Sequence, residues 1–334
     1  MKLSCVASAL LAGLAAAVPT PTPTENGPLD ERTIEKRATI TDACSVGYCT
    51  LNGGTKGGAG GTTTTVSSLA QFTAAVQAPG PAVVLVSGQL TGAVKVNVTS
   101  NKSIIGKAGS SLTGIGLTIL GQSNVIIRNL KSSKVLAEYG DVVTIQKSTN
   151  VWVDSCDFSA DLDHDKDYYD GLVDIVHASE WVTVSNTKFH DHWKGSLVGH
   201  SSSNAAEDTG HLHVTFYGNW FDNINSRTPM YRFGTGHVFN SYFSNMGETV
   251  IDTRDSAQML IESSVWEACP KKAIFTNDSN VGPGYAVVRD LDLGGSQNTA
   301  PVGTLTSVPY SYTLLGSANT KASVVANAGQ KLAF

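Results

Sequence analysis

Short runs of β-branched and aromatic residues recur along the chain, and each run ends at a polar residue and a bend. Apolar and polar residues alternate within each run, a pattern that predicts strands. The starts of successive runs lie about 22 to 32 residues apart, a period typical of solenoid proteins. The runs begin at Asn124, Asn150, Trp181, His213, His237 and Met259.

Stacked coils explain these repeats best, because one coil cannot bury its own inner face whereas a stack encloses a continuous core. The sequence therefore predicts an all-β fold, a right-handed parallel β-helix with long loops that form a groove. A β-propeller needs about 40 residues per blade, and a jelly roll would not repeat. We expect residues 67–77 to form a short amphipathic helix that caps the N-terminal end. Stacked polar residues are expected at the coil corners, at Asn129, Ser155, Asn186, Asn219, Asn240 and Ser263.

The composition agrees with this fold and excludes several others. The chain has 334 residues, of which 33 are Gly, 15 % are charged and 41 % are hydrophobic. So few charges argue against a helical bundle, and so many apolar residues argue against disorder. A formal charge of −5 gives no electrostatic basis for binding nucleic acid.

The N-terminal residues have the pattern of processing signals. Residues 1–17 contain a basic start, an apolar stretch too short to cross a membrane and terminal alanines, which predicts a secretory signal peptide. Residues 18–37 end at a Lys-Arg pair, as a propeptide would. We therefore expect a secreted, extracellular and monomeric catalytic domain over residues 38–334. Two sequons, at Asn97 and Asn277, agree with secretion.

The cysteines suggest one disulfide. Cys44 and Cys49 are separated by only four residues and form the natural pair. Cys156 and Cys269 lie on runs roughly four coils apart, about 19 Å at a coil spacing of about 4.8 Å. A disulfide needs Cα atoms within about 7 Å, so we expect both of these thiols to be free and buried.

A cluster of aspartates between the runs suggests a calcium site. The EF-hand pattern fits neither possible register, and Asp161, Asp163 and Asp165 are expected in a solvated loop. Asp170 and Asp174 flank the entry to a strand, where an even spacing would place both carboxylates on one face. Asp141 opens the preceding coil and is the expected third oxygen ligand.

The histidine pairs 190/192 and 211/213 have no HExxH motif and no cysteine partner, so hydrogen-bonded histidines are expected instead of a zinc site. No G-x-S-x-G motif is present. Two arginines, Arg227 and Arg232, flank a proline. On these residues alone they are either functional cations beside the acidic cluster or structural guanidinium groups that bind turn carbonyls.

Four motifs in the second half of the chain resemble polysaccharide lyase family 1, and in detail its secreted fungal pectate lyases. The resemblance covers most of residues 40–315, and its motifs are DGLVD at 170–174, VTVS at 182–185, HWKGSLVGH at 192–200 and RTPMYR at 227–232.

This resemblance implies the same β-helix and a calcium-dependent β-elimination of polygalacturonate, the pectate of plant cell walls. It implies that Arg227 is the base that removes the C5 proton. It places Ca²⁺ at Asp141, Asp170 and Asp174, and it places substrate carboxylates on Lys194 and Arg232. An arginine base implies best activity at alkaline pH, because the guanidine pKa exceeds about 12 in water.

The chain departs from the family pattern at three positions. Ser155 stands where many relatives have histidine, Tyr139 where bacterial relatives often have a further calcium aspartate, and Val176 where some relatives have a substrate-binding lysine. The resemblance therefore implies weaker calcium binding in the absence of substrate and a less cationic groove.

Three other functions remain open on the sequence. A pectin lyase would act on methyl-esterified polymer without calcium, and it would carry arginines in place of the calcium aspartates. A galacturonan hydrolase would need two carboxylates, for which the cluster around Asp252 and Asp255 is the candidate. A non-catalytic wall-binding solenoid would not need Arg227, Lys194 and three aligned aspartates together.

Overall fold

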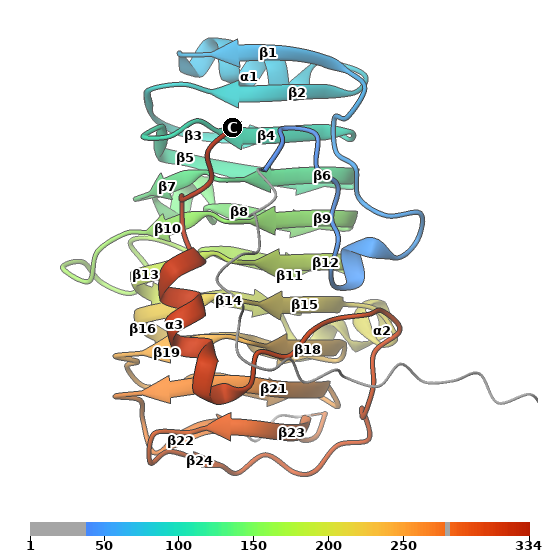
Figure 1. Ribbon diagram of the computed structural model, residues 1–334, viewed down its shortest axis with the longest axis vertical. Coiled ribbons are helices and arrows are strands. Elements are labelled where there is room, and N and C mark those ends of the chain that lie inside the picture. The colour runs from blue at the N-terminus through green and yellow to red at the C-terminus, as the bar shows by residue number, and fades with distance from the viewer. Residues whose placement is uncertain (1–37, 278–280) are drawn as a thin grey trace, which may run out of the picture.

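The computed structural model describes residues 38–277 and 281–334, which form a right-handed parallel β-helix (Figure 1). The expected signal peptide and propeptide lie outside the described residues. All pairings between strands are parallel, and they arrange the coils as three adjoining stacks. The first stack consists of β1 (Thr62–Val66), β2 (Ala82–Val86), β4 (Lys102–Gly106), β6 (Ser123–Arg128), β9 (Thr149–Asp154), β12 (Glu180–Ser185), β15 (His213–Tyr217), β18 (Thr235–Phe239), β21 (Gln258–Glu267) and β23 (Tyr285–Asp292).

The other two stacks share the long strand β5 (Ser111–Leu120), which follows β3 (Gln89–Asn97). The second stack continues through β8 (Val143–Gln146), β11 (Val173–Val176), β14 (Ser196–Val198), β17 (Met230–Arg232), β20 (Ile251–Arg254), β22 (Lys272–Phe275) and β24 (Gln297–Asn298). The third continues through β7 (Lys131–Ser133), β10 (Asp157–Ser159), β13 (Lys188–Lys194), β16 (Trp220–Ser226) and β19 (Tyr242–Ser244). All six predicted runs therefore form strands.

The corner that follows the first stack repeats one backbone conformation from coil to coil. Seven successive coils place a residue with φ between 43° and 65° there: Asn129, Ser155, Asn186, Gly218, Asn240, Ser263 and Asp290. Asparagine and glycine tolerate this left-handed region best. The expected Asn219 is one residue out of place, because Gly218 makes the bend in that coil.

Asn219 belongs instead to a ladder of side chains at the next position. Its Oδ1 accepts a hydrogen bond from the backbone N of Thr187 at 3.0 Å, and the Thr187 Oγ1 accepts from the backbone N of Cys156 at 3.2 Å. Ser241 and Ser264 continue the ladder in the following coils. Each side chain thus satisfies a buried backbone donor of the coil before it.

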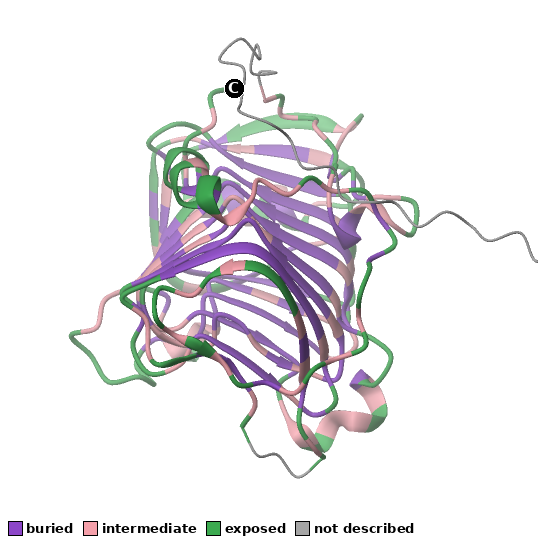
Figure 2. Ribbon diagram, turned by 60° about the horizontal axis from the view of Figure 1, so that its bottom comes forward, coloured by how far each residue is buried: buried purple, intermediate pink, exposed green. Residues whose placement is uncertain are grey.

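Buried apolar residues line the inside of the solenoid. Exposed residues lie mainly in the loops and on strands near the two ends, such as β1 and β23 (Figure 2). Four aromatic rings stack through consecutive coils along the third stack, whose last strand, β19, pairs with the second half of the long strand β21. The ring centroids of Phe189 and Phe221 are 4.6 Å apart, those of Phe221 and Phe243 5.2 Å, and those of Phe243 and Trp266 4.7 Å.

Helix α1 (Leu69–Gln77) packs against β2 and β3 at the N-terminal end of the solenoid, which confirms the predicted cap (Figure 1). It begins one residue after Ser68, whose Oγ accepts a hydrogen bond from the backbone N of Gln71 at 3.3 Å. Phe72 and Val76 are fully buried. The helix therefore covers a sheet edge that would otherwise be open to pairing with another chain.

The C-terminal segment ties late coils to early ones. Helix α3 (Ser317–Asn327) packs against β21, where the Thr320 Oγ1 donates to the carbonyl of Ser263 at 2.7 Å. The chain then runs back along the solenoid (Figure 1). There the backbone of Leu332 exchanges two hydrogen bonds with the Asn129 side chain, and the Gln330 Nε2 donates to the carbonyl of Ser110 at 2.8 Å.

The predicted disulfide joins Cys44 and Cys49, and both other cysteines are free. Cys156 is fully buried, as expected. Cys269 is only half-buried, which corrects the prediction. The reason is local, because Cys269 follows the end of β21 and the left-handed residue Ala268, so it lies in a bend instead of a strand. No helix among residues 38–277 and 281–334 is long and apolar enough to span a membrane.

Candidate active site

The predicted site residues gather where the chain enters the strands of the second stack. Asp141 precedes β8, Asp174 lies in β11, and Lys194 ends β13 just before β14. Arg227 precedes β17, and Arg232 is the last residue of that strand. Because these strands pair in parallel and in register, the segments that lead into them also stack upon one another.

Asp141 and Asp174 form a pair of buried carboxylates on either side of Gly171. The Gly171 backbone N donates to the Asp141 Oδ1 at 2.8 Å, and the Leu197 backbone N donates to the Asp174 Oδ1 at 3.0 Å. The Thr144 Oγ1 donates to the second oxygen of Asp141 at 2.7 Å. A Cβ added to Gly171 would lie 2.8 Å from Oδ1 of each aspartate, so only glycine leaves the space between them open.

The two carboxylates are held in an electrostatically unfavourable position. Burial raises the pKa of Asp141 to about 6, and the charge of Asp170 adds to this effect. Burial also raises the pKa of Asp174 well above its usual value, and the charge of Asp141 adds to it. A hard cation between two buried, repelling carboxylates would relieve both penalties. The residues present therefore fit a calcium ion.

Asp170 faces a different partner. It precedes β11, so only Asp174 lies within the strand, and the expectation that an even spacing would align both carboxylates on one strand face was wrong for Asp170. Its Oδ1 lies 3.3 Å from the Lys194 Nζ. Over the described ranges, no three His, Cys, Asp or Glu side chains are grouped closely enough to hold a metal ion on their own.

Lys194 is enclosed by the loop that precedes β11. Its Nζ lies between the carboxylates of Asp170 and Asp167, and only 12 % of its side chain is exposed. The backbone N of Lys194 donates to the Nδ1 of His192 at 3.0 Å. Burial and then the charge of Lys194 lower the pKa of His192 to about 4, so this histidine is a neutral acceptor that fixes the strand end.

Arg227 lies at a left-handed bend with φ 62°, followed by a cis peptide bond between Thr228 and Pro229. Its carbonyl accepts a hydrogen bond from the Ser196 backbone N at 2.6 Å, which joins this bend to the segment after Lys194. Burial raises the pKa of Asp174, whereas the positive charge of Arg227 lowers it. The guanidinium is therefore close enough to the carboxylate pair to influence it.

Arg232 is held by a partner that we did not predict. Its Nε lies 3.0 Å from the Asp255 Oδ2, and one NH group donates to the carbonyl of Gly199 at 2.8 Å. The Ser202 Oγ donates to the same Asp255 oxygen at 2.7 Å. The contact with Gly199 fits the structural interpretation of this arginine, and its substrate role stays a prediction. Arg232 pairs in register with Arg254 of the next coil, and two stacked arginines need acidic partners nearby. Recognising that pairing in the sequence would have pointed to an aspartate such as Asp255.

The acidic cluster in β20 and its following turn is not arranged for hydrolysis. Asp252 and Asp255 are fully buried. The Arg254 Nε donates to Asp252 at 2.8 Å, and Asp255 faces Arg232. Burial therefore keeps both carboxylates away from a polysaccharide substrate, which hydrolysis would require them to reach.

The histidine pairs are hydrogen-bonded, as expected. Nδ1 of His211 and Nδ1 of His213 lie 2.9 and 2.7 Å from the two oxygens of Glu180. His190 lies between Asp157 and Asp191. Asp163 and Asp165 are exposed, as expected. The expectation was wrong for Asp161, whose side chain is only 17 % exposed because its carboxylate accepts a hydrogen bond from the Tyr169 hydroxyl at 3.1 Å and lies 3.2 Å from the Lys134 Nζ.

Fold and site together define a β-helical protein with a carboxylate pair, a lysine and two arginines on one flank. Comparisons with known proteins agree. The profile of a family described as pectate lyase matches residues 7–332. The chain is 58 % identical over 319 residues to pectate lyase B of Colletotrichum gloeosporioides, which covers 95 % of each chain. It is 54 % identical over 307 residues to the probable pectate lyase B of Aspergillus flavus, which covers 91 % of this chain and 94 % of the relative.

Solved structures give the same result. The crystal structure of a pectate lyase from Bacillus sp. N165 in complex with trigalacturonate superposes with a TM-score of 0.79 at 29 % identity, over 86 % of this chain and 98 % of that one. The chain belongs to the pectate lyase family, and it is a lyase that acts on pectate.

Proposed function

We propose that the protein cleaves polygalacturonate by calcium-assisted β-elimination, with Arg227 as the base, and that it acts outside the cell. The observation that supports this most is the buried pair Asp141 and Asp174, which is separated by the open space over Gly171 and neighbours Lys194. The relative of known structure was solved with trigalacturonate, a fragment of this polymer.

The chemistry requires a weak carbon acid to lose its proton. The C5–H of a galacturonate unit adjoins a carboxylate, and removal of this proton places further negative charge on that group. Lys194 would bind the carboxylate and stabilise the developing charge. Calcium, held by Asp141, Asp174 and Asp170 together with substrate oxygens, would supply further charge neutralisation there.

Arg227 would take the C5 proton onto its guanidine nitrogen. The electron pair of the broken C5–H bond forms the C4–C5 double bond, and the glycosidic C4–O4 bond breaks. The departing O4 stays bonded to C1 of the neighbouring unit and takes a proton from solvent, so one new end is unsaturated and the other is a reducing end. Arg232 would bind a neighbouring uronate carboxylate through the part of its guanidinium that Asp255 and Gly199 leave free.

One assay separates this function from its alternatives. The mature chain, residues 38–334, is incubated with polygalacturonate or esterified pectin, with calcium or a chelator, and ultraviolet absorbance and reducing ends are followed. We expect absorbance on polygalacturonate that disappears with the chelator. Activity on pectin despite the chelator would indicate a pectin lyase. Reducing ends without absorbance would indicate a hydrolase, and the absence of any product would indicate a binding protein.

Variants test the proposed roles. Arg227→Ala is expected to lower kcat by at least 100-fold. Asp174→Asn is expected to raise the calcium concentration needed for half-maximal activity at least tenfold. Asp163→Asn removes one charge from an exposed loop and serves as the control. If Arg227→Ala keeps most of the absorbance, the base is another group.

Secretion has a separate test. The protein is recovered from the medium of cells that express the full chain, and its N-terminus is sequenced. We expect the sequence to start at Ala38, after the Lys36-Arg37 pair. A start near residue 18 would contradict the propeptide, and an intracellular full-length chain would contradict secretion. Gel filtration of the same sample tests the expected monomer.

A further inference from the structure

The ammonium group of Lys194 lies between two carboxylates that differ strongly in exposure. Its Nζ is 3.3 Å from the Asp170 Oδ1 and 3.4 Å from the Asp167 Oδ1. The Asp170 side chain is 42 % exposed and the Asp167 side chain 71 %. Asp167 is therefore the partner that solvent, or a ligand arriving from solvent, can replace most easily.

An ordered turn presents Asp167 to Lys194. The Asp165 Oδ1 accepts a hydrogen bond from the Asp167 backbone N at 3.0 Å, and the Asp165 carbonyl accepts from the backbone N of Tyr168, also at 3.0 Å. The ring of Tyr168 stacks on that of His164, with centroids 4.1 Å apart and planes 10° apart. The contact between Asp167 and Lys194 is thus supported by the loop backbone.

We propose that Asp167 is an internal substitute for the substrate, in that its carboxylate occupies on Lys194 the position that a uronate carboxylate takes during binding. The inference rests on the proposed function, because it requires Lys194 to bind uronate. The two groups are chemically alike, and both compete for the donors of one ammonium group. Asp170 would stay in place and keep Lys194 oriented while Asp167 is displaced.

The expected effect is on affinity and not on the chemical step. An exposed ion pair stabilises a protein only slightly. Removal of the Asp167 carboxylate, which competes with substrate for Lys194, should therefore tighten substrate binding by about two- to fivefold. Asp167 is displaced before the reaction, so kcat should not change. Added salt screens the competing contact, so the advantage of its removal should shrink as ionic strength rises.

The experiment compares Asp167→Asn with Asp163→Asn in the mature chain. Both variants remove one charge from the same loop, but of these two aspartates Asp167 is the one whose carboxylate forms an ion pair with Lys194. We expect Asp167→Asn to lower the KM for polygalacturonate and the Kd for trigalacturonate by about two- to fivefold, with kcat unchanged. Asp163→Asn should stay near wild type, and Asp167→Glu should restore the wild-type KM.

Equal changes of KM in Asp167→Asn and Asp163→Asn would overturn the proposal, because they would show that any negative charge in the loop has the same effect on substrate binding. A higher KM for Asp167→Asn would overturn it too. Lys194→Ala separates this failure from failure of the proposed function. If Lys194→Ala raises KM at least tenfold while Asp167→Asn changes nothing, only the substitute role fails. If Lys194→Ala leaves KM unchanged, the uronate-binding role of Lys194 fails.

Discussion

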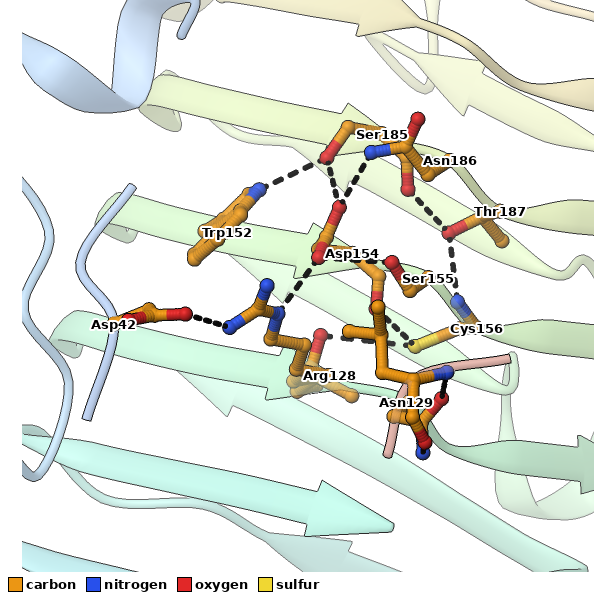
Figure 3. A network of polar contacts seen from close by, with 12 residues as sticks. Asp42, Arg128, Asn129, Trp152, Asp154, Ser155, Cys156, Ser185, Asn186 and Thr187 are labelled. Carbon is orange, nitrogen blue, oxygen red and sulfur yellow. Dashed lines mark hydrogen bonds and ion pairs between the residues drawn. The ribbon is translucent and has the colours of Figure 1, made fainter. Parts of the chain in front are cut away.

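Arg128 is a nearly buried cation held between two aspartates on the flank of the first stack (Figure 3). Its Nε lies 2.8 Å from Asp154, and one NH group lies 3.0 Å from Asp42. The side chain of Asp154 is 3 % exposed and also accepts from Ser185 and Asn186, whereas Asp42 is 28 % exposed. The two aspartates thus offer a matched pair of tests for the same guanidinium.

Asp154→Asn should destabilise the fold by about 3 kcal/mol, because it leaves a buried guanidinium without its main counter-charge. Asp42→Asn should cost less than about 1 kcal/mol, since that carboxylate is partly in water. Urea unfolding of the two variants checks the difference. Equal midpoints would show that burial does not decide the strength of these ion pairs.

Ser155 bears on the same network. Its Oγ donates to the Asp154 Oδ2 at 3.0 Å. The serine hydroxyl thus adds a hydrogen bond to the carboxylate that also holds Arg128. Ser155 is also one of the left-handed corner residues, with φ 53°.

The raised pKa of Asp141 gives the metal-free protein a pH dependence. The value in the folded protein, about 6, lies above the ordinary value of 3.8, so the folded chain binds this proton more tightly than the unfolded chain. The resulting stabilisation is fully present below about pH 4 and is lost as the pH rises through about 6.

Asp141→Asn removes this titration. In chelator, the variant should gain stability relative to wild type between pH 4 and pH 7, by on the order of 2 kcal/mol. Urea midpoints at several pH values measure that difference, with Asp163→Asn as the control for general charge. A difference that does not vary with pH would show that Asp141 titrates normally.

Some of the site could be predicted from the sequence and some could not. The convergence of Asp141 and Asp174 follows from coil register, because residues one coil apart stack. The turn of Asp170 toward Lys194 depends on the path of a 13-residue loop between β10 and β11, and spacing does not fix that path. The ion pair between Arg232 and Asp255 joins two coils, and the directions of these two side chains can be read only from the structure.

At the scale of elements, the third stack is organised by its aromatic rings. Phe221 is fully buried and stacks between Phe189 and Phe243. The runs in the sequence predicted these strands because apolar and polar residues alternate in them. Composition alone could not distinguish Gly218 from Asn219 as the corner residue, since both glycine and asparagine tolerate positive φ.

Phe221→Ala should destabilise the fold by about 3 to 5 kcal/mol, because the cavity interrupts the ring stack between two coils that cannot close the gap. Phe221→Leu should cost less, as it keeps most of the apolar volume. Val302→Ala, at a site that is 84 % exposed, should change stability by less than about 0.5 kcal/mol. Thermal or urea unfolding measures all three, and a Phe221→Ala protein as stable as Val302→Ala would contradict the argument.

At the scale of the whole molecule, most contacts join neighbouring coils, and such proteins can unravel coil by coil from an end. The C-terminal segment is different, because α3 is bonded at Ser263 while Leu332 is bonded at Asn129. This tie couples coils that do not otherwise touch.

Removal of residues 330–334 should therefore weaken early coils without touching the site. We expect faster hydrogen exchange around Asn129 and a broader thermal transition, with kcat on polygalacturonate unchanged at a temperature where both proteins are folded. Asn129→Ala in the full-length chain should reproduce the exchange effect. Unchanged exchange in both variants would show that the tie carries no stability.

The same tie sets an order of events during synthesis. A solenoid can assemble its first coils while the rest of the chain is still being made. Here the bonds that complete the Asn129 corner come from Leu332, 203 residues further along the chain. The coil that contains Asn129 thus reaches its final form only after Leu332 has been made, long after its own strands have been synthesised.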